Sequence, residues 1–216
     1  MVPVVAFVGY HNSGKTSFAT KVVEILTRRG YRVGVLKSTK HRGLIKDVPG
    51  TDTYRYKEAG ALRVGLAEPE RLTVMGEYTV KEPSYLAFTH FGDCDVVICE
   101  GFKSSNLPKF EVVREELKEK MLGRELKNLI GVVADFEVEG VKTFPIDKPE
   151  KVADFIEERF IKGGPKAVMF INGKEVPMNR FVQESLKGVI KGFISALKGI
   201  DEPLKRVEIR IDVEKE

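Results

Sequence analysis

Four segments of the chain carry continuous apolar runs rich in β-branched residues. They cover residues 4–8, 31–37, 95–102 and 129–135. Runs of this kind are typical of strands that are covered on both faces of a parallel sheet. Two shorter strands are expected over 63–67 and 71–75.

Helical periodicity separates these strands. Phe18, Val22, Ile25 and Leu26 fall on one stripe of a helix that begins near Thr16, and "RRG" at 28–30 supplies the cations and glycine of a helix end. Further helices are expected at "PSYLAFTHF" (83–91) and "KPEKVADFIEERF" (148–160). Strands that alternate with helices predict an α/β fold: a mostly parallel sheet flanked by helices.

The pattern changes at "IKGGPKA" (161–167), whose glycines and proline suggest a short linker. Beyond it we expect a strand within 167–176, a helix from about 179 to 198, and an alternating strand over 206–213. The chain therefore divides into a main domain, 1–162, and a small C-terminal β-α-β annex, 163–216. The annex is too small to be expected to fold alone, so it docks on the main domain or on a partner.

The stretch "GYHNSGKTS" (9–17) lies where the first strand turns into the first helix. It contains G-x-x-x-x-G-K-[ST], the pattern of a phosphate-binding P-loop of the Walker A type. In such a loop the glycines let main-chain N–H groups approach phosphate oxygens, the lysine reaches the terminal phosphates, and the threonine ligates Mg²⁺. We predict a nucleoside triphosphate site with Mg²⁺, formed by Gly9, His11, Asn12, Ser13, Gly14, Lys15, Thr16 and Ser17.

A P-loop nucleotide brings Mg²⁺, which needs an acidic residue at the end of a neighbouring strand. Glu100, which closes "DVVICE", is the best candidate, whereas Asp95 opens the same strand at its far end and is expected to be structural. The long polar segment 38–60 leaves the second strand at the same edge of the sheet. It offers Asp52 for the metal side, and Lys40 and His41 for an anionic ligand. Lys15, Asp52 and Glu100 are thus the candidate catalytic residues, and Thr16, Asp52 and Glu100 the candidate metal ligands.

Composition narrows the function classes. Charged residues make up 31% of 216 residues, but the net charge is only +4, so a nucleic-acid partner is not favoured. The start "MVPVVAFV" lacks the charged region of a signal peptide, and no stretch has the roughly 18 apolar residues of a membrane span. A cytoplasmic protein without a membrane segment is expected. The chain has 2 cysteines and 3 histidines, without metal-ligand spacing.

Three motifs in order resemble one family. They are "GYHNSGKTS", the block "KDVPGTDTYRYKEAGA" (46–61), and "DVVICEGFK" (95–103) followed by "LPKFEVVR" (107–114). Together they resemble the molybdopterin-guanine dinucleotide biosynthesis adaptor family MobB over about the first 160 residues. The segment from Gly164 onward has no counterpart in the short bacterial members.

The resemblance implies a homodimeric P-loop protein that binds GTP with Mg²⁺ and hydrolyses it weakly. It implies assistance to the guanylyltransferase that attaches GMP to molybdopterin, so at most a slow GTPase is expected. It also implies that Gly101 and Lys103 line the nucleotide rim. Members usually carry a histidine-rich run after the second strand, whereas "LKSTKHRG" here has a single histidine.

Guanine preference rests mostly on this resemblance, because the N-K-x-D signature of many GTPases is absent. Asp135 ends the strand "LIGVVAD", where its carboxylate could accept from guanine or could cap a turn. Two other functions stay open. A small-molecule kinase would need an arginine lid, for which Arg114 and Arg124 are candidates; a metallochaperone GTPase would need a Cys or His cluster. The annex alone could also be a protein-binding module.

Overall fold

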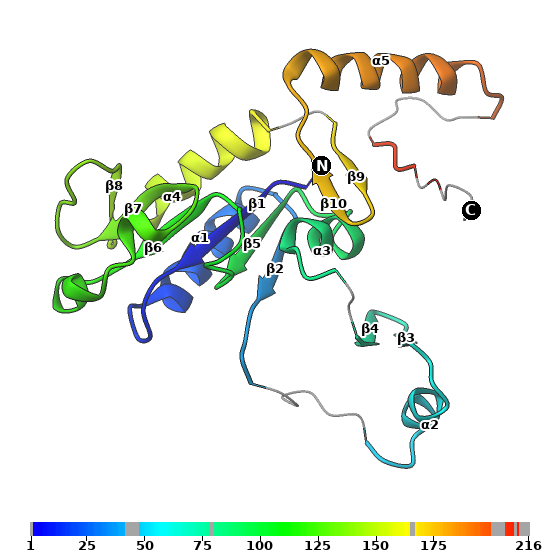
Figure 1. Cartoon of the computed structure of the whole chain (residues 1–216), viewed down its shortest axis with the longest axis horizontal. Helices are drawn as coiled ribbons and strands as arrows, with labels where there is room; N and C mark the ends of the chain where they lie inside the picture. The colour runs from blue at the N-terminus through cyan, green and yellow to red at the C-terminus, as the bar shows by residue number, and fades with distance from the viewer. Residues whose placement is uncertain are drawn as a thin grey trace.

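A six-stranded sheet forms the centre of the molecule, and every pair of neighbouring strands in it is parallel (Figure 1). The structure is a computed structural model that describes residues 2–41, 48–77, 80–164, 167–199, 206–209 and 211. Across the sheet the strands run in the order β2 Val33–Lys37, β5 Val96–Glu100, β1 Val4–Val8, β6 Lys109–Val112, β7 Leu129–Ala134 and β8 Thr143–Pro145. The expected parallel α/β sheet is confirmed.

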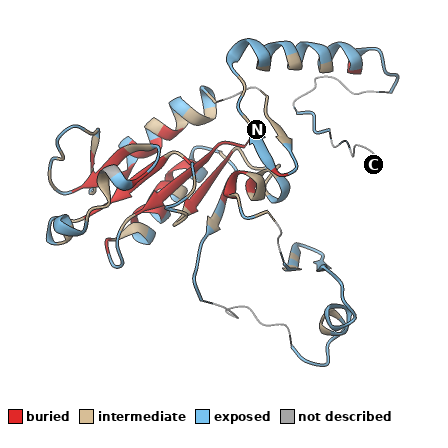
Figure 2. Cartoon of the chain, in the orientation of Figure 1, coloured by how far each residue is buried: buried red, intermediate tan, exposed pale blue. Residues whose placement is uncertain are grey.

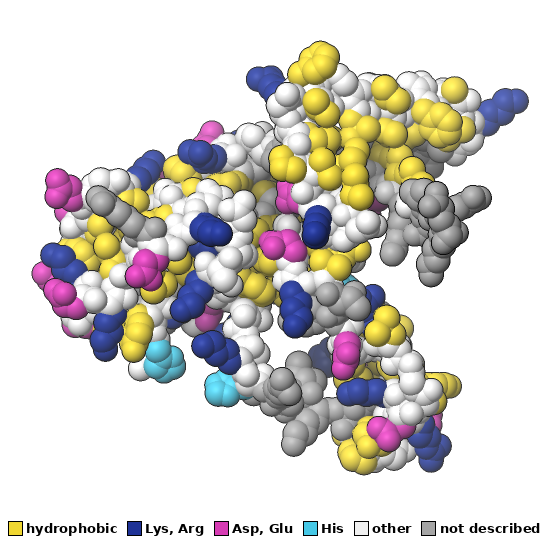
Figure 3. Space-filling view, viewed as in Figure 1, with side chains coloured by type: hydrophobic (Ala, Val, Ile, Leu, Met, Phe, Trp, Pro, Cys, Tyr) yellow, Lys and Arg dark blue, Asp and Glu magenta, His cyan; other side chains and the backbone are white. Residues whose placement is uncertain are grey.

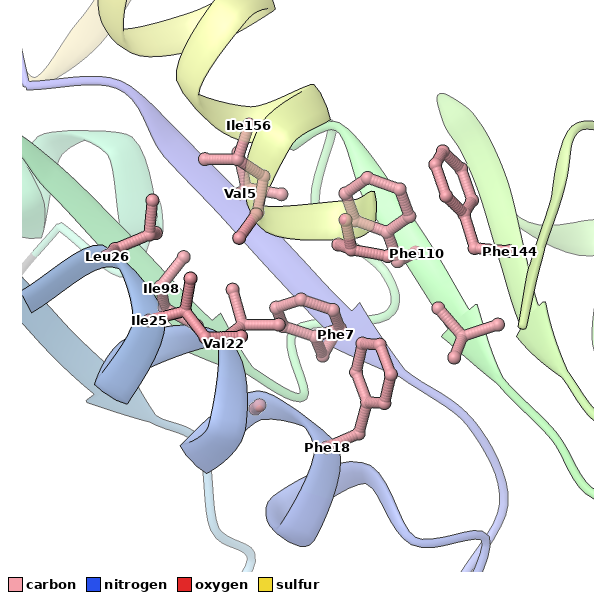
Figure 4. Close-up of a cluster of buried hydrophobic side chains, with 14 of the residues drawn as sticks. Val5, Phe7, Phe18, Val22, Ile25, Leu26, Ile98, Phe110, Phe144 and Ile156 are labelled. Carbon is pink, nitrogen blue, oxygen red and sulfur yellow. The ribbon is translucent and has the colours of Figure 1, made fainter. Parts of the chain in front are cut away.

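Helices cover both faces of this sheet. Helices α1 (Lys15–Arg28) and α4 (Pro149–Ile156) lie on one face, and α3 (Pro83–His90) packs on the other. The predicted apolar stripe of α1 is confirmed, since its side chains are buried against β1 and β5 in the core of Figure 4. Figure 2 shows burial concentrated in the sheet and in the sides of the helices that face it. The core therefore holds the carboxyl ends of β1 and β5 rigidly side by side.

Strand β6 differs from its neighbours because charged side chains are buried in it. Phe110 and Val112 join the core beneath α1 and α4, whereas Lys109 and Glu111 alternate onto the opposite face. The Lys109 ammonium donates to three main-chain carbonyls, and the Glu111 carboxylate accepts from the N–H groups of Leu122 and Gly123. These bonds tie down the segment after β6, which contains the 3₁₀ turns η1 (Glu115–Lys120) and η2 (Gly123–Glu125).

An arm projects from the sheet between β2 and α3 (Figure 1). It consists of helix α2 (Asp52–Glu58) and an antiparallel hairpin of β3 (Arg63–Glu68) and β4 (Arg71–Gly76). The two short predicted strands are confirmed. Helix α2 lies inside the segment that the pattern marked only as polar loop; Thr51 caps it by accepting from the N–H of Tyr54, and none of its residues is buried.

The annex follows α4, whose last turn widens into the π-helix η3 (Glu157–Lys162). It contains a hairpin of β9 (Met169–Ile171) and β10 (Lys174–Val176), then helix α5 (Arg180–Ser195). A hairpin thus replaces the single strand expected before the helix. Residues 206–209 and 211 of the expected last strand form no strand, and the rest of 206–213 lies outside the described residues, as do 165–166 of the linker.

The hairpin of the annex docks on α3. The Phe170 ring lies 5.5 Å from that of Tyr85 and 4.9 Å from that of Phe88, and Arg206 donates to the Cys94 carbonyl oxygen at 3.3 Å. Helix α5 is mostly exposed, and Figure 3 shows hydrophobic side chains gathered along it. No helix within the described ranges is long and apolar enough to cross a membrane.

Candidate functional site

The loop between β1 and α1 has the backbone of a phosphate cradle. Gly9, Asn12 and Gly14 have φ angles of 145°, 60° and 86°, so the chain turns through conformations that favour glycine or asparagine. A Cβ on Gly9 would collide with the carbonyl oxygen of Val112 and lie 2.9 Å from the Ser13 hydroxyl. The glycine is therefore required by the close approach of β6.

A buried hydroxyl inside this loop lacks a partner. The Ser13 side chain is fully buried, and its Oγ makes no hydrogen bond within the part of the chain that the structure describes. Such a group costs free energy unless a ligand or water satisfies it. Helix α1 also begins without a side-chain cap, at Gly14, so its first N–H groups face the same loop. These features fit a bound phosphate, as predicted for this segment.

Lys15 is folded back over its own loop. Its ammonium donates to the main-chain oxygen of Tyr10 at 2.6 Å. Burial lowers the pKa of Lys15, the charge of Glu100 raises it, and the charge of Lys37 lowers it. Thr16 and Ser17 follow in the first turn of α1 and are exposed. The lysine thus stands at the mouth of the loop, with both hydroxyls beside it.

Glu100 ends strand β5 directly beside the P-loop strand. The register pairs Glu100 with Phe7 of β1 on one side and with Lys37 of β2 on the other. Its carboxylate is 15% exposed and accepts from the Lys37 ammonium at 2.9 Å. The structure therefore brings the predicted metal-side carboxylate to the same sheet edge as Lys15 and Thr16.

A pocket of about 420 Å³ opens beside Lys15. Its lining residues come from the P-loop and from the segments that follow β2, β5 and β6: Gly9, Tyr10, His11, Lys15, Ser38, Lys40, Lys103 and Leu122. Gly101, at φ +92°, donates its N–H to the Phe7 carbonyl at 3.0 Å and passes close to Ser38. The predicted rim residues His11, Lys40, Lys103 and Gly101 thus lie at one edge.

Of the other predicted site residues, Asp52 lies away from the P-loop, whereas Asp135 and His41 each make a hydrogen bond of their own. Asp52 begins α2 on the arm, apart from the β1–α1 turn in Figure 1, and its exposed carboxylate lies 3.6 Å from Arg55. A metal role for Asp52 would require the arm to close over the P-loop. Asp135 follows β7 and accepts from the N–H of Glu115 at 2.8 Å, the turn-capping alternative. His41 is exposed, and its N–H donates to the Thr39 hydroxyl.

Two cations at the site were not predicted as part of it: Lys37 was given no role, and Arg114 was a candidate only for the lid of a kinase. Lys37 forms the ion pair with Glu100, and Arg114, between β6 and η1, has its guanidinium next to the P-loop. A Cβ on Gly14 would lie 3.5 Å from Nε of Arg114. The signal was present, since both residues directly close or follow strands at the carboxyl edge. Within the described ranges, no three His, Cys, Asp or Glu residues form a group that could hold a metal ion.

Comparison with known proteins places this geometry in a family. A family model described as "Molybdopterin guanine dinucleotide synthesis protein B" matches residues 4–135, more than half of the chain. The chain belongs to the MobB family. The matched range contains the P-loop, the arm and Glu100, so the resemblance seen in the sequence motifs is confirmed.

Individual MobB proteins agree with this assignment. A Haemophilus influenzae protein named "Molybdopterin-guanine dinucleotide biosynthesis adapter protein" is 36% identical over 160 residues, covering 72% of this chain and 88% of that protein. A solved structure of "molybdopterin-guanine biosynthesis protein B (mobB)" has a TM-score of 0.57 at 28% identity and covers 72% of this chain and 97% of that one. A Methanocaldococcus jannaschii relative, 27% identical over 237 residues, covers 98% of each chain. A MobB relative therefore aligns along the annex as well.

Proposed function

We propose that this protein binds GTP with Mg²⁺ at the P-loop and acts as an adaptor in molybdenum cofactor biosynthesis, assisting the formation of molybdopterin guanine dinucleotide. The observation that carries the nucleotide site is the buried, unpartnered Ser13 hydroxyl inside the glycine loop. The names of the MobB relatives support the pathway, since they are called molybdopterin-guanine dinucleotide biosynthesis adapter proteins.

In this proposal, one set of groups in the chain binds the phosphates and another binds the metal. The first N–H groups of α1 and the Ser13 hydroxyl would donate to phosphate oxygens, and Lys15 would leave the Tyr10 carbonyl to reach the terminal phosphates. Thr16 and Glu100 would hold Mg²⁺, which neutralises the charge on the phosphates when bound.

Hydrolysis is expected to be slow. The only carboxylate that the structure brings beside Lys15 in its described part is Glu100, and it is engaged by Lys37. We therefore expect at most a slow GTPase, whose bound nucleotide serves the adaptor role rather than rapid turnover. For guanine we propose Asp135, whose carboxylate is oriented by the Glu115 N–H at the end of β7.

The partner we propose is the molybdopterin guanylyltransferase, and the assembly we propose is a homodimer. An isolated two-stranded hairpin is marginally stable in water, yet the arm carries Leu72 and Val74 on one face of its hairpin, 69% and 50% exposed. A second copy of the chain that covers this face would remove the free-energy cost of exposing these two side chains to water. Light scattering after gel filtration should give a mass twice that of one chain. Leu72→Glu should shift the measured mass toward that of a single chain. We also expect a cytoplasmic location.

Calorimetric titration tests the nucleotide site. Wild-type protein should bind GTP with Mg²⁺ more tightly than ATP, and Lys15→Ala should lower GTP affinity by at least about a hundredfold because it removes the terminal-phosphate cation. Lys21→Ala is the matched control, since Lys21 is exposed nearly two turns further along α1. Unchanged GTP affinity in Lys15→Ala would overturn the assignment of this loop.

A further inference from the structure

Glu100 and Lys37 form a pair whose two members are buried to very different degrees. The Glu100 side chain is 15% exposed and that of Lys37 is 58% exposed, with 2.9 Å between Oε1 and Nζ. A carboxylate so far removed from water needs a cation or hydrogen-bond donors. Among the described residues, Lys37 is the only side-chain cation within 4 Å of it.

The pair lies in the charge field of the P-loop lysine. Glu100 raises the pKa of Lys15 and Lys37 lowers it, after the larger lowering by burial. The strand register places Glu100 opposite Lys37 on one side and opposite Phe7 on the other, and Phe7 lies two residues before the P-loop that carries Lys15. The neighbourhood of the metal-side carboxylate therefore already contains two cations.

A divalent cation and the Lys37 ammonium cannot both sit against this carboxylate without strong repulsion. Like charges a few ångströms apart at a partly buried site repel strongly, because the surroundings screen them less than bulk water does. One of the two must leave when the other arrives.

The geometry makes Lys37 the one that can leave. Its side chain is mostly exposed and ends a long flexible stem, so it can return to water at little cost. The backbone beneath it is held independently, since Ser38 donates its N–H to the Glu100 carbonyl at 2.9 Å. A change of side-chain rotamer suffices, and the strands need not move.

We propose that Lys37 is an internal counter-ion for Glu100 that exchanges with Mg²⁺. Without the metal it neutralises the carboxylate and lets a metal-free nucleoside triphosphate enter; with the metal it turns out into solvent. Lys37 is thus a positioning residue that sets how strongly nucleotide binding depends on Mg²⁺. The inference rests on the proposed nucleotide site.

The test compares GTP affinity in excess Mg²⁺ with that in EDTA. In Lys37→Met the bare carboxylate repels metal-free GTP, so affinity in EDTA should fall by about tenfold or more, while affinity in Mg²⁺ should change by less than about threefold. Lys37→Arg should behave like wild type, because it restores the cation.

A double-mutant cycle with Glu100→Gln separates the pairing role from direct phosphate contact. If Lys37 acts through Glu100, adding Lys37→Met to Glu100→Gln should change affinity in EDTA by less than about threefold. Equal losses in EDTA and Mg²⁺, or a full loss in the Glu100→Gln background, would show that Lys37 contacts phosphate and would overturn the exchange. Equal affinities of Lys37→Met and wild type in EDTA would overturn it too.

The same titrations test the counter-ion role of Lys37 separately from the proposed GTP-binding function. Failure of the wild-type protein to bind GTP in Mg²⁺ would contradict the proposed nucleotide site itself. Binding by wild type with an unaltered Mg²⁺ dependence in Lys37→Met would leave that site standing and reject the counter-ion role alone.

Discussion

The two ends of strand β5 each pair an acidic residue with a basic residue of the β2 segment, but they do so differently. At the amino end, the Asp95 carboxylate accepts from the Arg32 main-chain N–H at 2.8 Å and from its guanidinium at 2.9 and 3.3 Å, and Asp95 donates its own N–H to the Arg32 carbonyl. At the carboxyl end, the Glu100 carboxylate has one ion pair among the described residues, with the mostly exposed Lys37.

The difference indicates a structural role for the ion pair at the amino end of β5 and a functional role for the one at the carboxyl end. At the amino end, bonds from Arg32 within the chain satisfy the Asp95 carboxylate. The carboxyl end carries polar groups that are incompletely satisfied within the described part of the chain. They are the Ser13 hydroxyl, which has no hydrogen-bond partner, the start of α1, which has no side-chain cap, and the Glu100 carboxylate, whose ion-pair partner is mostly exposed. Ligands of open α/β sheets bind at this end for the same reason.

The largest expected effect is the contrast between two glycines: Gly9, directly after β1, and Gly30, just after α1. Gly9→Ala should abolish GTP binding and cost roughly 3 kcal/mol of folding stability, because the new Cβ meets the Val112 carbonyl at a φ of +145°. Gly30→Ala has open space around it at φ +88°, so it should cost about 1–2 kcal/mol and leave binding intact. Urea unfolding and calorimetry measure both; similar binding losses would contradict the contrast.

The two carboxylates of β5 should give opposite results. Asp95→Asn should lower unfolding free energy by about 1 kcal/mol, since part of its charge-assisted bonding is lost at a partly exposed site, and leave nucleotide binding unchanged. Glu100→Gln should change stability less and reduce the Mg²⁺ dependence of GTP binding. Urea denaturation with paired titrations checks this. A stability loss at Glu100 larger than at Asp95 would reverse the assignment.

The pH dependence sharpens the same comparison. Hydrogen bonds from the Arg32 side chain hold the pKa of Asp95 below its ordinary 3.8. A lowered folded-state pKa means that the stabilisation is present above about pH 4 and is lost as pH falls through the folded value. The stability gap between wild type and Asp95→Asn should therefore be constant near neutrality and shrink in acid. A gap that widens below pH 4 would contradict the assigned pairing.

The smallest expected effect is at the rim. Lys40→Met should weaken GTP binding by about threefold at low salt, and the difference should fade in high salt, because an exposed lysine contributes through a screened field. Lys21→Met on α1 should have no effect. Salt-dependent titrations measure it, and a loss that persists at high salt would indicate direct contact.

The fold was predictable where apolar residues alone carry the pattern. Strands β1, β5 and β7 and the stripe of α1 follow from that pattern. Strand β6 was not assigned as a strand, because Lys109 and Glu111 are buried through bonds to main-chain groups that no hydrophobic period reveals. Helix α2 has no buried residue, so it shows no stripe.

The annex hairpin had a local signal that went unused. Asn172 and Gly173, at φ 50° and 75°, form the turn between β9 and β10, and Asn-Gly is the dipeptide that such hairpins prefer. In the site, the motif located the P-loop and the strand end located Glu100. The Lys37 pairing needed the strand order, since β2 lies beside β5 rather than beside β1.

A crystal structure of the full chain with a non-hydrolysable GTP analogue and Mg²⁺ would show whether the P-loop holds the nucleotide. We expect phosphates against the N–H groups at the start of α1, the Ser13 hydroxyl bonded to a phosphate oxygen, and the metal between Thr16 and Glu100. A nucleotide bound elsewhere, with the Ser13 hydroxyl still unpartnered, would contradict this expectation.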